Sequence, residues 1–243
     1  MKFKTFFSLK RTTILCLLLF LAFSITGCGK NYEKTYQSYT KSLIAINYLG
    51  ATKDFIDATG ANQEDADALY DSNIKLLANN IQTYYNVTIS DAPALQTEYE
   101  NLARNIYSKV NYKVSKAYKG SNSYYVDITI YPIDLFNQTS SEVSAYIDEF
   151  NLAVSNGDYN EKTFEQYETD FSTGLIKILN DGCLEMTYAD PVTVTVEIIH
   201  DGDTFYISDS DFLAIDRAMI NASVQYNNVS EEEQTEASET SEE

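Results

Sequence analysis

Residues 190–207 decide the fold and read DPVTVTVEIIHDGDTFYI. Apolar residues fill alternate positions of this stretch: Val192, Val194, Val196 and Ile198. A two-residue period is typical of a strand with one buried face. Asp201-Gly202 is a strong turn pair, and Phe205 and Ile207 would carry the return strand. The pattern predicts an antiparallel hairpin over 190–207.

A second hairpin is predicted over 111–131, NYKVSKAYKGSNSYYVDITIY. One face of its first strand would carry Tyr112, Val114 and Tyr118. One face of its second strand would carry Tyr124, Val126, Ile128 and Ile130. An isolated hairpin is barely stable in water. We therefore expect the two hairpins to join into one four-stranded antiparallel sheet.

Helical spacing fills the remaining segments. Apolar residues recur every three to five positions within 36–110, 139–181 and 210–221. The last apolar stripe of the second segment consists of Phe164, Tyr167, Phe171, Leu175 and Ile178. Expected helix caps are Asn62, Thr139 with Glu142 as a capping box, Thr163 with Gln166, and Ser208 to Asp211. Amphipathic helices on one face of an antiparallel sheet predict an α+β fold, with a single domain over 36–225.

The N-terminus has the pattern of an export signal. Four basic residues, Lys2, Lys4, Lys10 and Arg11, precede an uncharged apolar run that ends in Ile25-Thr26-Gly27-Cys28. That ending resembles the lipobox of bacterial lipoproteins. The resemblance implies cleavage between Gly27 and Cys28, a signal peptide over 1–27 and diacylglycerol on the Cys28 thiol. An uncleaved spanning anchor and an ordinary cleaved signal are the alternatives.

The resemblance also implies a location. A lipidated Cys28 with a tether over 28–35 would hold the domain on the outer face of the cytoplasmic membrane, with the membrane as its partner and no other cofactor. The rest of the chain resembles uncharacterised lipoproteins of Gram-positive bacteria that have a cystatin-like or nuclear-transport-factor-like sheet. No activity comes with that resemblance.

Charge excludes one class of partner. The 243 residues hold 17 Lys and Arg against 36 Asp and Glu, a net charge of −19. Nucleic-acid affinity comes largely from basic residues, so we expect no nucleic-acid partner. Residues 230–243, SEEEQTEASETSEE, lack large apolar side chains and predict a disordered acidic tail. The tail either keeps the protein soluble or binds a cation or partner.

Few residues suggest catalysis. His200, the one His of the chain, is expected at an exposed hairpin tip, and Cys183, in an acidic stretch, as a buried structural thiol. A weak calcium site is conceivable at Asp201, Asp203, Asp209 and Asp211, although a turn and a helix cap explain all four. Tyrosines Tyr84, Tyr85, Tyr124, Tyr125 and Tyr131 fit either ordinary packing or a ligand-binding concavity.

Three functions follow from these observations. The first is a lipid-anchored, non-enzymatic binding or interaction module of the cell envelope. The second is a solute-binding lipoprotein of a transporter, which should show two lobes of parallel strands and helices. The third is a hydrolase that uses two opposed carboxylates in a cleft. The sequence favours the first.

Overall fold

The computed structural model describes residues 32–201 and 204–222. Its sheet is antiparallel, with strand order β1-β3-β4-β5 and a short β2 that also pairs with β3. The strands are β1 (Asn111–Val114), β2 (Tyr118–Lys119), β3 (Tyr124–Tyr131), β4 (Val192–Asp201) and β5 (Thr204–Ile207). The α+β class is confirmed. The expected four strands become five, because the first hairpin supplies both β1 and β2.

The two predicted hairpins join through β3 and β4. Val126 lies opposite Val196, and Ile128 lies opposite Val194. Val126, Ile128 and Val196 are fully buried, whereas Thr195 on the other face is exposed. The alternation in the sequence therefore marks the face that the helices cover.

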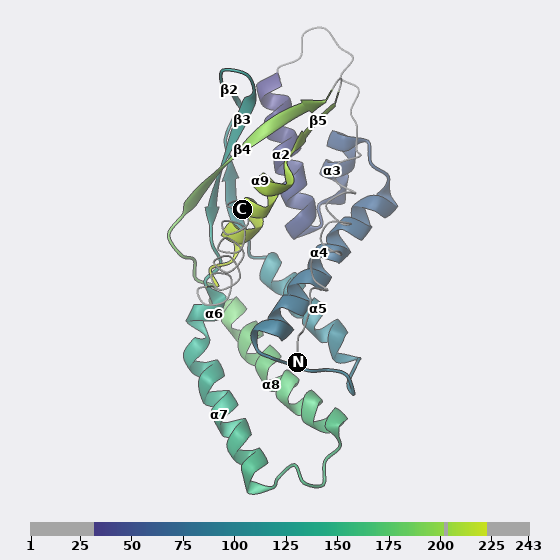
Figure 1. Cartoon of the computed structure of the whole chain (residues 1–243), viewed down its shortest axis with the longest axis vertical. Coiled ribbons are helices and arrows are strands. Elements are labelled where there is room, and N and C mark those ends of the chain that lie inside the picture. Colours follow the sequence, from purple (N-terminus) through teal and green to yellow (C-terminus); the bar gives the residue numbers. More distant parts are fainter. Residues whose placement is uncertain (1–31, 202–203, 223–243) are drawn as a thin grey trace, which may run out of the picture.

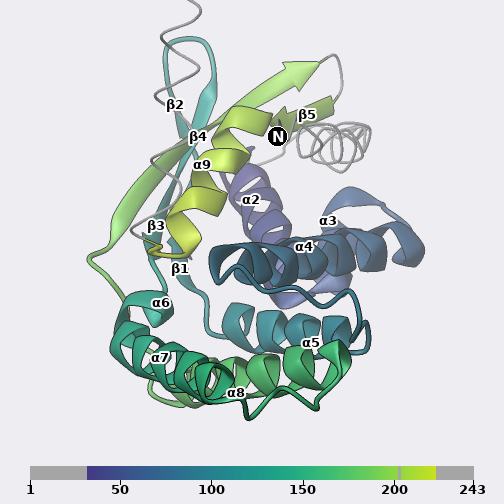
Figure 2. The same cartoon turned by 60° about the horizontal axis from the view of Figure 1, so that its bottom comes forward.

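Helices α2 (Tyr32–Leu49) and α9 (Asp209–Met219) contact that face. Helices α3 (Thr52–Thr59), α4 (Gln63–Tyr84) and α5 (Leu95–Tyr107) pack against α2. Figure 2 shows α2 and α9 next to the sheet and α4 beyond them. Helix α2 begins at Tyr32, inside the segment 28–35 that the sequence assigned to a tether.

The remaining helices form a separate arm. Helices α6 (Leu135–Gln138), α7 (Ser140–Asn156) and α8 (Phe164–Leu184) follow β3, and α7 and α8 run away from the sheet as a hairpin (Figure 1). Helix α8 packs against α5, while α7 packs mainly against α8 and α6. The arm thus joins the rest of the molecule through α8 and through Phe136 of α6, which packs on Tyr84.

A buried carboxylate fastens this arm to the loop that precedes α5. Glu168 on α8 is 6% exposed, and its carboxylate accepts hydrogen bonds from the backbone N–H groups of Asp91 and Ala92 at 2.9 and 3.0 Å. Ser90 Oγ donates a third, at 3.3 Å. Backbone donors satisfy the buried charge, so the role of Glu168 is structural.

Three of the four predicted helix caps form. Asn62 accepts from the N–H of Asp65, Thr163 and Gln166 make a capping box, and Ser208 accepts from the N–H of Asp211. The capping box predicted at Thr139 is wrong: Thr139 Oγ1 donates to the carbonyl of Leu135 at 2.8 Å. Because α6 runs almost directly into α7, Thr139 lies in helical backbone instead of the extended backbone that such a cap requires.

Three predicted buried positions are exposed, and the first is Val192, which begins β4 and is 42% exposed. Tyr118 is 43% exposed because Ser115 to Ala117 interrupt the strand, and Ala117 takes the buried position. Phe164 is 77% exposed because it is the first residue of α8, at the far end of the arm. Within residues 32–201 and 204–222, no helix has the length and apolar character needed to cross a bilayer.

Candidate functional site

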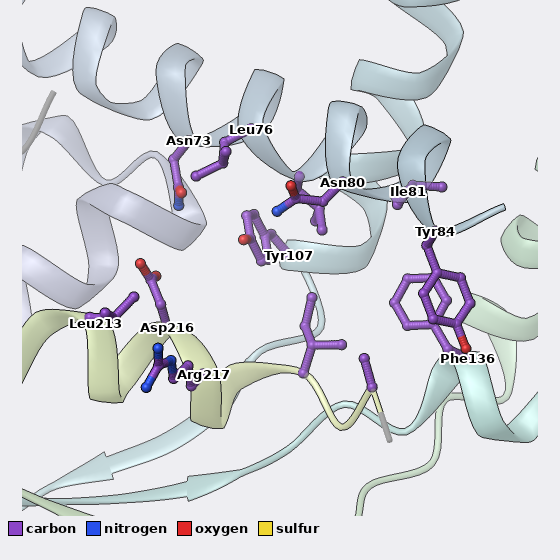
Figure 3. A pocket seen from close by; sticks show the side chains of 13 residues that line it. Asn73, Leu76, Asn80, Ile81, Tyr84, Tyr107, Phe136, Leu213, Asp216 and Arg217 are labelled. Carbon is purple, nitrogen blue, oxygen red and sulfur yellow. The ribbon is translucent and has the colours of Figure 1, made fainter. Parts of the chain in front are cut away.

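A cleft between α4 and α9 is the candidate binding site. Its volume is about 100 Å³. Helices α4, α5, α6 and α9 and the residues after α9 line it: Asn73, Leu76, Leu77, Asn80, Ile81, Tyr84, Tyr107, Phe136, Leu213, Asp216, Arg217, Ile220 and Ala222. Figure 3 shows the side chains of α4 and α9 facing one another across the opening.

Asp216 is the acidic residue of the cleft. Its carboxylate accepts a hydrogen bond from the hydroxyl of Tyr48 on α2, and Tyr48 is fully buried. Burial raises the pKa of Tyr48 well above its ordinary value, and the charges of Asp216 and Tyr107 raise it further. Tyr48 therefore stays a neutral donor that fixes the position of the carboxylate.

Other polar residues of both helices line the cleft with Asp216. Asn73 Nδ2 on α4 donates to the carbonyl of Asn47 at 2.5 Å, which ties α4 to α2. Asn80 lies two turns further along α4, and the exposed Arg217 follows Asp216 on α9. In Figure 3 the Asp216 carboxylate points from α9 toward α4, and Arg217 projects from the next position of α9. The cleft thus presents an anion, a cation and amide groups together.

The other end of the cleft is aromatic. The rings of Tyr84 and Phe136 lie 5.4 Å apart there. Tyr107 lies between the two ends and packs edge-on against Tyr48 at 5.1 Å. One end of the cleft is therefore polar and the other apolar. A small group with a charged head and an apolar body matches this arrangement.

Size and donor set limit the chemistry of the cleft. Its volume is below the roughly 300–1,000 Å³ typical of pockets that enclose a whole ligand. Hydrolysis by a carboxylate pair needs a second acid, and Asp216 is the one acid among the described residues that line the cleft. The arrangement suits reversible binding of a terminal or small polar group.

Two of the four calcium candidates, Asp209 and Asp211, can be placed, and both have structural roles at the start of α9. Asp211 Oδ2 accepts from the N–H of Glu197 at 2.9 Å, which ties α9 to β4, and Asp209 lies in the first turn of α9. Asp203 and the side chain of Asp201 lie outside the described residues. Within the described part of the chain, no three His, Cys, Asp or Glu side chains lie close enough to hold a metal ion.

His200 and Cys183 lie apart from the cleft. His200 is exposed, as predicted, but its Nε2 also makes a 2.9 Å hydrogen bond with the hydroxyl of Tyr36 on α2. Cys183 is 1% exposed, which confirms the predicted burial, and burial raises the pKa of its thiol to about 11. Such a thiol is a poor nucleophile at neutral pH.

The five tyrosines do not form one concavity. Tyr84 and Tyr85 pack with Phe136 at the end of α4, and Tyr124 packs on Tyr36 of α2 at 5.0 Å. Tyr125 and Tyr131 lie on the uncovered face of β3, opposite to the face of Tyr124, and are six residues apart. This distribution favours the packing interpretation.

The remaining predicted sites cannot be placed. Gly27, Cys28 and the tail 230–243 lie outside the described residues. The sequence analysis missed Asp216 and Arg217, which look there like ordinary surface charges of a short helix.

Among solved structures, the chain is similar to "a putative lipoprotein (ycdA)" from Bacillus subtilis. The TM-score is 0.54 and the sequence identity is 13%. The alignment covers 77% of this chain and 56% of that one, so the likeness extends over little more than half of the neighbour. At this identity it shows the fold alone. No family model and no curated protein match the sequence.

Proposed function

We propose that the protein is a lipid-anchored lipoprotein of the bacterial cell envelope that works as a non-enzymatic binding module. The observation that carries the proposal is Ile25-Thr26-Gly27-Cys28 at the end of an export signal. The fold shared with a protein described as a putative lipoprotein supports it.

The geometry of the cleft supports binding over catalysis. Asp216 is fixed by Tyr48, Arg217 is exposed, and the aromatic end offers an apolar surface. These groups can hold a small charged head beside an apolar body, and the cleft lacks the paired acids of a hydrolase among its described residues. We propose the α4–α9 cleft as the contact surface of the module.

The solute-binding alternative has less support. Such a protein would enclose its ligand between two lobes of parallel strands and helices. The described residues form one antiparallel sheet covered on one face, and the cleft lies among helices.

Membrane fractionation of cysteine variants tests the anchor. The chain has three cysteines with different expected fates. The Cys28→Ala variant should lose incorporation of labelled fatty acid and leave the membrane fraction once its signal is processed. Cys16→Ala, inside the signal, and Cys183→Ala, in the folded domain, should keep both properties. If Cys28→Ala keeps the label or stays membrane-bound after processing, lipidation at Cys28 is wrong.

A further inference from the structure

We propose that the end of the domain at the start of α2 faces the bilayer and that Lys116 and Lys119, beside β2, contact its anionic headgroups. The inference rests on the lipidation of Cys28 proposed above. Helix α2 starts at Tyr32, so only the three residues from 29 to 31 separate it from the lipidated residue. Four extended residue steps reach about 14 Å. The start of α2 therefore lies close to the headgroups.

Strand β2 shares this end of the molecule. The ring of Tyr32 lies 6.4 Å from that of Tyr124, and Tyr124 pairs with Lys119 across β2 and β3. On the other face of the sheet, the rings of Tyr118 and Tyr125 lie 6.0 Å apart. Figure 1 shows β2 and the start of α2 at one end of the long axis and the α7–α8 arm at the opposite end. A short tether at one end thus points the arm away from the membrane.

The exposed groups at this end suit an anionic bilayer. Tyr32 and Tyr118 are 45% and 43% exposed. Lys116 and Lys119 are exposed and have no ion-pair partner among the residues that the structure describes. Exposed tyrosine rings and lysine ammonium groups are the side chains that favour the interface of an anionic membrane.

Charges of neighbouring segments agree with this assignment. The first turn of α2 adds Lys34 to Lys116 and Lys119. The acidic residues near these groups are Glu33 in the same turn, Asp127, which accepts a hydrogen bond from the Tyr118 hydroxyl, and Glu197, opposite Tyr125. Basic residues therefore match the acidic ones at this end, in a chain with about twice as many acidic as basic residues. The acidic excess on the rest of the surface would repel anionic lipid. This repulsion and the short tether therefore orient the domain in the same direction. The lipid holds the protein, and this surface orients it.

Single-tryptophan variants test the orientation, since the chain contains no Trp. The full-length lipidated protein would be placed in vesicles that contain phosphatidylglycerol and a lipid spin-labelled at its headgroup. Tyr118→Trp is the probe. Tyr188→Trp is the matched control, because Tyr188 is 38% exposed and pairs with Ile133 beyond the far end of β3. The account predicts severalfold quenching of Tyr118→Trp emission and little loss for Tyr188→Trp.

A charge reversal tests the headgroup contact. Lys119→Glu in the Tyr118→Trp background should reduce the quenching severalfold, whereas Lys75→Glu, an exposed lysine of α4, should not. Equal quenching of the two probes in vesicle-bound protein overturns the orientation, and unchanged quenching in Lys119→Glu overturns the headgroup contact. A wild-type chain that is unmodified at Cys28 and fails to sediment with vesicles overturns the proposed function itself.

Discussion

Helices α2 and α7 have nearly the same length, 18 and 17 residues, but ten residues of α2 are buried and only two of α7. Helix α2 contacts the sheet on one side and α3, α4 and α5 on the others. Helix α7 contacts mainly α8 and α6. The most buried helix thus follows the proposed anchor, while the least buried one lies at the opposite end (Figure 1).

This difference predicts two kinds of response to mutation. Burial supplies most of the stability of a helix, so changes beside α2 should act on the whole fold. Changes in the arm should open α7 alone, because few contacts connect it to the rest. The following predictions test the difference, beginning with the largest effect.

Ile128→Ala should lower the free energy of unfolding by about 2–5 kcal/mol, the usual cost of such a core truncation. Ile128 is fully buried in β3 beneath the helices. Urea denaturation followed by circular dichroism measures the effect. Thr129→Ala, the next residue on the opposite face, is the control and should change stability much less. Equal costs for the two variants would contradict the assignment of the buried face.

Alkaline pH should unfold the α2 side of the molecule. Burial raises the pKa of Tyr39 on α2 to about 12, from its ordinary 10.0. Because the folded state keeps this proton more tightly, its stabilisation is complete below pH 10 and is lost between about pH 10 and 12. At about 1.4 kcal/mol per unit, the loss is about 2–3 kcal/mol. Tyr39→Phe should flatten the fall of stability over this pH range; an unchanged slope would exclude Tyr39 as its source.

Two consecutive residues of α9 should differ in their effect on stability. Asp216→Ala removes the acceptor of the buried Tyr48 hydroxyl and should cost about 1–3 kcal/mol, the penalty for an unsatisfied buried donor. Arg217→Ala removes an exposed side chain and should change stability by less than about 0.5 kcal/mol. Thermal unfolding of both variants is the measurement. A loss of stability in Arg217→Ala as large as in Asp216→Ala would show that the arginine is structural.

Gly174→Ala should loosen α7 and leave the sheet intact. A methyl group at Gly174 on α8 would lie near the ring of Tyr146 on α7, whose hydroxyl donates to the Phe171 carbonyl at 2.9 Å. Hydrogen exchange should therefore speed up in α7 but not in β3, with a small change in global stability. Thr173→Ala, at the exposed neighbouring position, is the control. Faster exchange in β3 would show that the arm and the sheet unfold together.

The sequence was informative where a local pattern sufficed. Alternation predicted β3 and β4, and the polar residues Asn62, Thr163 and Ser208 marked real helix starts. It failed where a neighbouring segment decided the outcome: Thr139 is preceded by the short helix α6, which the sequence did not predict.

Local sequence patterns did not predict the long-range contacts. Helices α2 and α7 both show amphipathic stripes, and no local sequence pattern indicates that other helices cover α2 on several sides. The cleft joins Asn73 to Asp216, residues far apart in the chain that are each ordinary polar positions of a helix. Only the placement of α4 and α9 on opposite sides of the cleft brings them to one site.

The most direct test is the intact mass of the protein extracted from membranes of cells that express the whole chain, together with fragmentation of its N-terminal peptide. The account predicts a chain that begins at Cys28 and carries diacylglycerol on that residue. A chain that begins at any other residue, or an unmodified Cys28 in the membrane-bound protein, would contradict it.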